Sequence, residues 1–159
     1  MPGAYSRLAT EDERNRAYQV IAAWAERLLA PDGPLIAVDG DAINHRWYLR
    51  IAGEDRDYIA IWLTVDQRSI RYEVYLMPAP AQRACETFEY LLRRNADLAG
   101  MHFAIGAEDA IYLVGSSPVA SFDALELDRI IGTAFEQVER HFATAMSMGF
   151  AWRYRRARR

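Results

Sequence analysis

Hydrophobic and polar side chains alternate in three successive runs between residues 46 and 76. In each run every second residue is apolar, which is typical of half-buried strands in an antiparallel sheet with one face in water. The apolar sets are Trp47, Leu49 and Ile51, then Ile59, Ile61, Leu63 and Val65, then Ile70, Tyr72, Val74 and Leu76. Turn residues at 53–55 and 66–69 separate the runs. The pattern predicts a three-stranded antiparallel meander.

Apolar residues at spacings of three and four predict helices over 10–29, 81–96 and 122–147. The first and third helices begin with the spacing of a capping box, formed by Thr10 with Glu13 and by Asp123 with Glu126. The apolar stripe of the second helix consists of Cys85, Phe88, Leu91 and Leu92. These residues are therefore expected to face the core.

Two more strands follow the second helix, one over 101–105 and one over 110–115, whereas Leu35–Val38 is a candidate for a short extended piece before a turn at 39–41. The order α-βββ-α-ββ-α predicts an α+β fold with a five-stranded, mainly antiparallel sheet and flanking helices. One domain is expected over 10–150, with flexible termini at 1–9 and 153–159. The expected core consists of Trp47, Leu49, Ile59, Ile61, Leu63, Phe88, Leu91, Phe103, Leu113, Ile131, Phe135 and Val138.

The amino-acid composition excludes several classes of protein. Of 159 residues, 52% are hydrophobic and 12% are aromatic, which is enough for one domain with a real core. No run approaches the roughly 18 apolar residues of a membrane span, and the start lacks the apolar stretch of a signal peptide, so a cytoplasmic protein is expected. All 19 basic residues are arginine, which excludes the lysine of a P-loop and the amine of a Schiff-base enzyme. Cys85 is the single cysteine, which excludes an intrachain disulfide and a thiolate metal cluster, and it is expected to be buried.

Charge is unevenly distributed along the chain. The net charge of −3 combines +5 in the last seven residues, which include five arginines, with −8 in residues 1–152. Because neutralisation of phosphates dominates affinity for nucleic acid, an acidic body makes a nucleic-acid partner unlikely. The arginine-rich tail leaves weak binding to nucleic acid or to an anionic surface as an alternative, and a solvated end is favoured.

Candidate catalytic and metal-binding residues are scattered. His45, His102 and His141 lie 57 and 39 residues apart, without the spacing of a zinc site, and no metal or cofactor is predicted. His102 alternates with apolar neighbours and is expected to face water, and His141 lies off the apolar stripe of the third helix and is also expected at the surface. The enzymatic alternative is a site assembled from His45, Glu108 and Asp109, although acidic residues between two strands commonly bond the backbone of a turn.

The water-facing side of the predicted meander carries arginine and aromatic side chains. They are Arg46, Tyr48, Arg50, Trp62, Arg71 and Tyr75. One interpretation is a solvated sheet with cross-strand pairs. The other is a surface that binds a partner protein, because tyrosine, tryptophan and arginine are the residues that anchor interfaces.

Gly132 interrupts the third helix at a cost of about 1 kcal/mol relative to alanine. Neutral drift and close approach by another helix or a second subunit are equally good explanations. A dimer contact at Gly132 is therefore a candidate.

Several segments resemble one known family. They are Asn44–Arg50, Tyr75–Pro80, Arg93–Asn95 and Phe103–Ala110, together with the string GMHFAIGAEDAIYLVG. Over residues 10–150 the chain resembles the YbjN family, and more narrowly its actinobacterial branch. The resemblance implies the type III secretion chaperone-like fold, whose element order agrees with the order predicted from periodicity.

The resemblance also implies a role without catalysis. YbjN proteins are described as regulators of sensory transduction tied to stress and motility, and the secretion chaperones that share the fold are acidic homodimers that bind extended segments of client proteins. The expected function is thus a protein-interaction module, a regulator or chaperone-like adaptor for a protein client, acting as a homodimer. The acidic body agrees with this, the arginine tail departs from it, and the family has no motif-defined functional residues to transfer.

Overall fold

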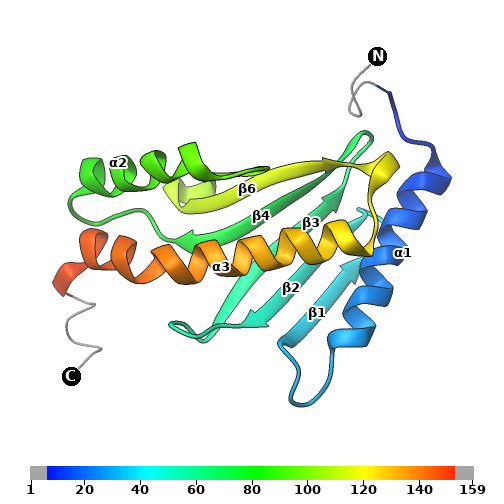
Figure 1. Cartoon of the computed structure of the whole chain (residues 1–159), viewed down its shortest axis with the longest axis horizontal. Coiled ribbons are helices and arrows are strands. Elements are labelled where there is room, and N and C mark those ends of the chain that lie inside the picture. The colour runs from blue at the N-terminus through cyan, green and yellow to red at the C-terminus, as the bar shows by residue number, and fades with distance from the viewer. Residues whose placement is uncertain (1–6, 153–159) are drawn as a thin grey trace.

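A computed structural model describes residues 7–152, which form three α-helices and six strands in chain order (Figure 1). The helices are α1 (Glu11–Leu28), α2 (Ala84–Arg94) and α3 (Ala124–Gly149). The strands are β1 (Leu35–Asp41), β2 (Arg46–Ala52), β3 (Tyr58–Val65), β4 (Ser69–Met77), β5 (Met101–Ile105) and β6 (Ile111–Pro118). Three short 3-10 turns, η1 (Asn95–Asp97), η2 (Ala107–Asp109) and η3 (Val119–Ser121), lie after α2, β5 and β6. The α+β class is confirmed.

The strands form one antiparallel sheet in the order β1-β2-β3-β4-β6-β5, so the predicted number of five strands is wrong. The segment interpreted as a short piece before a turn is a full strand that pairs with β2 as far as Asp41 and Arg46. A register shift between Leu35 and Ala37 breaks the alternation there and hides the strand from a periodicity argument. Gly40 lies inside this strand, and the position requires glycine because a Cβ would come within 2.6 Å of the Trp47 ring.

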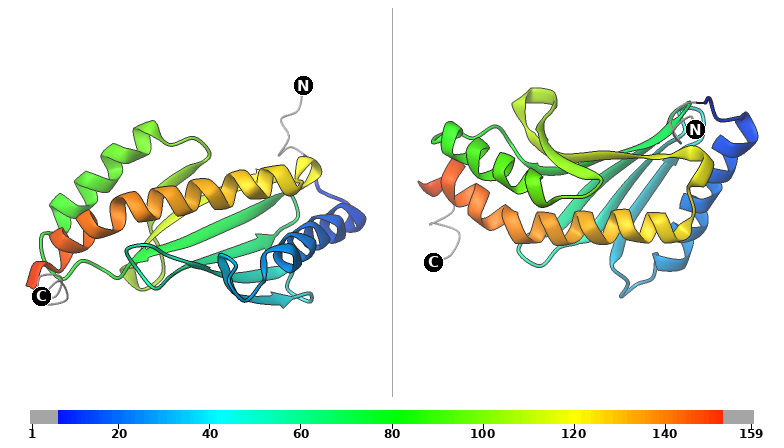
Figure 2. Two further views of the ribbon diagram at one scale, coloured as in Figure 1. Left: turned by 60° about the horizontal axis from the view of Figure 1, so that its bottom comes forward. Right: turned by 45° about the horizontal axis from the view of Figure 1, so that its top comes forward.

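All three helices cover the same side of the sheet, here called the inner face, and leave the other side uncovered (Figures 1 and 2). The inward-pointing side chains of the strands and the apolar stripe of α3 form one core. Ten of the twelve predicted core residues are buried, but Phe88 and Phe135 are only partly buried against it.

Helix α2 presents a different face from the predicted one. Thr87 and Leu91 are buried, whereas Cys85 is exposed and Leu92 is 62% exposed. The helix begins only at Ala84, after Arg83 in a left-handed conformation with φ of 48°. The predicted start at 81 is therefore three residues too early, and the buried side of the helix is centred on Thr87 and Leu91.

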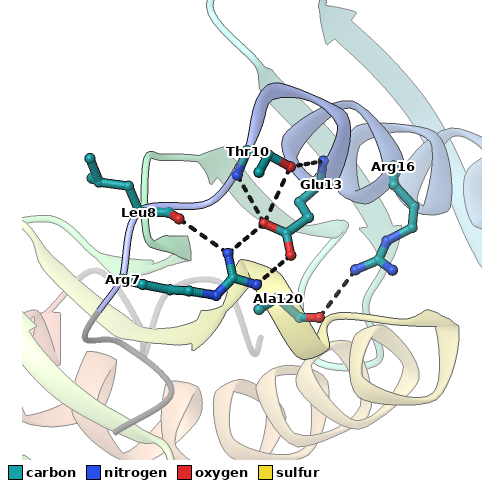
Figure 3. A network of polar contacts seen from close by, with 6 residues as sticks. All are labelled: Arg7, Leu8, Thr10, Glu13, Arg16 and Ala120. Atoms are coloured by element: carbon teal, nitrogen blue, oxygen red, sulfur yellow. Dashed lines mark hydrogen bonds and ion pairs between the residues drawn. The ribbon is translucent and has the colours of Figure 1, made fainter. Parts of the chain in front are cut away.

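The helix starts agree with the predicted caps. At α1 both halves of the capping box form: the Glu13 N–H donates to Thr10 Oγ1 and the Thr10 N–H donates to the Glu13 carboxylate, over 3.2 and 2.8 Å (Figure 3). Arg7 pairs with the same carboxylate and, with the Thr10 N–H, lowers the pKa of Glu13 to about 2. At α3 Asp123 caps the Glu126 N–H, but the Glu126 carboxylate binds Ser117 and Arg129 instead, so only half of that box exists.

The segment before α1 is bonded to the turn between β3 and β4, where the Ala9 N–H donates to Gln67 O over 2.7 Å. Helix α1 itself is bonded to η3, where Arg16 donates to Ala120 O over 3.1 Å (Figure 3). Residues 1–6 and 153–159 lie outside the described part of the chain. The predictions of flexible ends there and of an anionic partner for the arginine-rich tail therefore stay predictions.

Candidate protein-interaction surface

The uncovered side of the sheet, here called the outer sheet face, carries all six residues predicted for partner binding. They are Arg46, Tyr48, Arg50, Trp62, Arg71 and Tyr75, from β2, β3 and β4. Strand register places Tyr48 opposite Trp62, and places Arg46 and Arg71 on either side of Thr64. The sheet thus assembles into one surface side chains that are up to 29 positions apart in the sequence.

Aromatic rings pair across the strands of this face. The centroids of Tyr48 and Trp62 are 5.1 Å apart, and the Arg50 guanidinium lies 4.8 Å from the Tyr58 ring centroid. Further along, Tyr75 meets Tyr112 of β6 edge to face at 5.6 Å. Such contacts hold the rings in place before a partner binds. Binding would therefore cost little additional side-chain conformational entropy.

Tyr75 is more constrained than the sequence predicts. Arg56, in the loop after β2, donates to the carbonyl oxygens of Tyr75 and Leu76 over 3.3 and 3.0 Å, and its guanidinium lies 4.6 Å from the Phe142 ring centroid. Burial lowers the pKa of Arg56 and raises the pKa of the Tyr75 phenol. Arg56, whose guanidinium also lies 5.8 Å from the Tyr75 ring centroid, therefore links Tyr75 to Phe142 of α3, and Tyr75 is half-buried.

The arginines of this face differ in their partners. Arg71 pairs with Asp66 in the turn between β3 and β4. Arg50 stacks on Tyr58, and its Nε is buried without a hydrogen-bond partner among the described residues. A buried donor without an acceptor costs free energy. Because this Nε is buried, a bound molecule can reach only the terminal nitrogens of the Arg50 guanidinium.

The structure separates the three residues proposed for an enzymatic site. His45 lies in the turn between β1 and β2, beside Arg14 of α1, whereas Glu108 and Asp109 lie in the β5–β6 hairpin at the other end of the strand order. Glu108 and Asp109 are exposed and have left-handed φ values of 57° and 55°. The three residues do not form a site. Between residues 7 and 152, no group of three His, Cys, Asp or Glu side chains is placed to hold a metal ion.

His141 is buried, so its predicted surface position is wrong, whereas His102 is exposed as predicted. The Tyr90 hydroxyl and His141 Nδ1 share a hydrogen bond of 2.7 Å, and the Phe103 ring packs edge-on at 5.7 Å. Burial lowers the pKa of His141, and the positive charges of Arg94 and Arg140 add to the effect. The spacing of Ala134, Val138, His141 and Ala145 is the signal that could have placed this histidine on the inner stripe of α3.

Comparison with known proteins identifies the family. The sequence profile of YbjN, described as "Putative bacterial sensory transduction regulator", matches residues 17–145. The chain belongs to the YbjN family. It is 30% identical over 116 residues to the uncharacterized protein Rv0487 of Mycobacterium tuberculosis, covering 69% of this chain and 63% of that protein. It is also 30% identical over 105 residues to the uncharacterized protein ML2442 of Mycobacterium leprae, covering 66% of this chain and 57% of that protein. The chain thus spans about three-fifths of the length of these relatives.

The fold of this YbjN-family chain has a counterpart among solved structures. It is similar to the type III secretion chaperone SycH of Yersinia pestis, solved in complex with a stable fragment of YscM2, with a TM-score of 0.51 and 10% sequence identity. The match covers 77% of this chain and 96% of SycH. At this identity the likeness concerns the fold alone, and it confirms the predicted type III secretion chaperone-like fold.

A Cβ added at Gly132 would meet nothing within 4 Å, so packing within the chain does not require the glycine, and a contact with a second subunit stays a prediction. None of the helices within residues 7–152 is long and apolar enough to cross a lipid bilayer.

Proposed function

We propose that this YbjN-family chain is a non-enzymatic protein-interaction module, a regulator or chaperone-like adaptor that binds a protein client on its outer sheet face. The proposal rests on one observation: the helices leave one whole face of the sheet uncovered (Figure 2). This face carries arginines and aromatic rings that are held in place by contacts with one another. Side chains of this kind anchor protein interfaces at low entropic cost.

The side chains of the outer sheet face indicate what kind of client segment would bind there. Trp62 and Tyr48 offer flat apolar surface, and Arg50 offers the terminal nitrogens of its guanidinium, since its Nε is buried. A client segment that brings one apolar side chain and, a few residues away, a carboxylate would satisfy both. A charge-assisted hydrogen bond to Arg50 would fix the register of that segment on the sheet.

The family and the fold support a role in interaction. The YbjN description names regulation of sensory transduction, and SycH, whose fold is similar, was solved with a bound protein fragment. The candidate catalytic residues do not converge, which leaves no described observation in favour of an enzyme.

The test compares variants in affinity capture from the native cell. Tyr48→Glu places a charge in the centre of the outer sheet face, and Arg50→Ala removes the guanidinium. Leu125→Glu is the matched control, because Leu125 is 77% exposed on α3, on the helical side of the molecule. We expect a client that co-purifies with the native protein and the control but is lost at least tenfold with both outer-face variants. A set of captured proteins that is the same for all four would disprove the assignment of this face.

A further inference from the structure

The rings of Tyr48 and Trp62 form a small apolar area on the outer sheet face, and charged residues surround it. Across the strands, the register aligns one row of four residues: Asp39 of β1, Tyr48 of β2, Trp62 of β3 and Glu73 of β4. Along β2, Arg46 and Arg50 lie two residues to either side of Tyr48. The apolar area is therefore only two side chains wide, or about 10 Å at the usual spacing of strands. An amphipathic helix needs an apolar stripe over several turns and would cover these charges, so the area suits a single small apolar ring.

The backbone beneath this ring pair has no free edge. Strands β2 and β3 lie inside the sheet, and each is paired on both sides. A client in the β conformation could not extend the sheet here, so its backbone N–H and C=O groups would depend on side chains for partners. A polyproline II segment avoids much of this cost, because proline has no N–H and the conformation is set before binding. Its carbonyl oxygens can accept hydrogen bonds from the Trp62 indole N–H and the Tyr48 hydroxyl.

A hollow in the outer sheet face begins at Glu73, next to Trp62. It has a volume of about 620 Å³, and its lining includes Arg71, Glu73, His102, Val114 and Ser116. The guanidinium of Arg71 already pairs with Asp66, so the Glu73 carboxylate adds a negative charge to the hollow. A basic side chain of a client would be complementary to Glu73. The charge of −8 over residues 1–152 attracts basic segments in the same way.

The spacing between the ring pair and the hollow fits a polyproline II segment that crosses the strands. Two strand spacings, or about 9.6 Å, separate the middle of the pair from the midpoint between Glu73 and its partner Val114 on β6. Three residues of polyproline II span about 9.3 Å and complete one turn. A proline on the ring pair and a basic residue three positions away would therefore both face the sheet.

We propose that the client segment is a polyproline II helix, with a proline on the Tyr48–Trp62 pair and a basic side chain three residues away at Glu73. This inference rests on the proposed function and names the chemical class of the client. It is compatible with the carboxylate proposed for Arg50, because Arg50 lies further along β2, outside the row that the segment crosses.

The first test measures binding of synthetic peptides to the full chain by fluorescence anisotropy, with protein up to about 1 mM so that weak complexes are detected. The probe is a fluorescein-labelled peptide of alanine and proline with one arginine three positions after a proline. Two matched peptides replace the arginine by glutamate, or every proline by alanine. We expect the probe to bind at least tenfold more tightly than either matched peptide. Equal binding of all three peptides, or no binding of the probe, would overturn the inference.

Two variants assign the contacts of the probe. Glu73→Gln removes a negative charge and keeps the size of the side chain, so it should reduce the preference for arginine over glutamate at least fivefold and keep the preference for proline. Trp62→Thr should lose the preference for proline over alanine. Glu136→Gln, at an exposed glutamate of α3, is the control that should bind all three peptides as the native chain does. A native preference for arginine in Glu73→Gln would refute the contact at Glu73, whether or not Trp62→Thr folds.

Affinity capture separates this inference from the proposed function. If Tyr48→Glu loses a client but the proline-containing probe does not bind the native chain, the polyproline II segment is refuted and the outer sheet face remains a client surface. If Tyr48→Glu captures the same proteins as the native chain and the probe does not bind, both proposals fail.

Discussion

At the scale of single residues, His141 is a buried titratable group whose protonation should affect stability. His141 of α3 is enclosed by Tyr90 of α2 and Phe103 of β5, and its pKa lies below the ordinary value of 6.5 because burial disfavours the charged ring. The positive charges of Arg94 and Arg140 also lower the pKa of His141. The histidine is therefore a neutral packing residue, and it contributes fully only while it remains neutral.

The sign of the pH dependence follows from linkage. Below the ordinary pKa of 6.5 the unfolded chain binds a proton at His141 while the folded chain resists it, so the free energy of unfolding should fall as pH drops from 7 towards 5. His141→Gln keeps a polar partner for Tyr90 and cannot titrate, so it should lack this component of the slope. His102→Gln, at an exposed histidine, should keep the native slope. Denaturant unfolding at several pH values would measure all three, and parallel curves for the native chain and His141→Gln would contradict the assignment.

At the scale of elements, the side chain of Asn95 connects the end of α2 to the edge strand β5. Strand β5 is five residues long and lies at the edge of the sheet, where unpaired backbone groups invite association with other strands. Asn95, in the 3-10 turn after α2, satisfies both polar groups of Phe103. The turn thus positions α2 against β5 and closes the edge at the same time.

Removing this side chain should both destabilise the domain and open the edge. Asn95→Ala leaves the N–H and C=O of Phe103 unpaired, and we expect the free energy of unfolding to fall by about 1–3 kcal/mol. The amide proton of Phe103 should also exchange faster with solvent. Asn15→Ala, at an exposed asparagine in α1, is the control and should have little effect. Native-like protection of the Phe103 amide in Asn95→Ala would show that the hydrogen bonds contribute little.

At the scale of the whole molecule, the one-sided arrangement of helices leaves one face of the sheet open and buries the other (Figure 2). The outer sheet face carries the residues proposed for client binding, and the inner face packs against the three helices. Because the core lies between the outer sheet face and the exposed surface of the helices, a substitution on one of these surfaces should not alter the other.

This separation predicts that a substitution on the exposed surface of a helix leaves client binding unchanged. Leu92→Asp, at a leucine of α2 that is 62% exposed, should keep the native affinity capture of a client, whereas Tyr48→Glu should lose it. The combined variant should lose the client as Tyr48→Glu does and melt close to the sum of the single effects, because distant sites are additive. Loss of client capture in Leu92→Asp would mean that the client also contacts α2.

The amino-acid sequence by itself determined which residues of β2, β3 and β4 point inward, where α1 and α3 begin, and the α+β class. These features depend on local periodicity and on capping side chains close to the helix start. Only the tertiary structure decided that β1 is a strand, because its pairing relies on β2 and on Gly40 against the Trp47 ring. The tertiary structure also decided that Cys85 and Leu92 of α2 are exposed and that His141 is buried, since the burial of His141 depends on Tyr90 of α2 and Phe103 of β5. The same holds for the outer sheet face: periodicity selected its residues, and strand register alone brought Tyr48 beside Trp62.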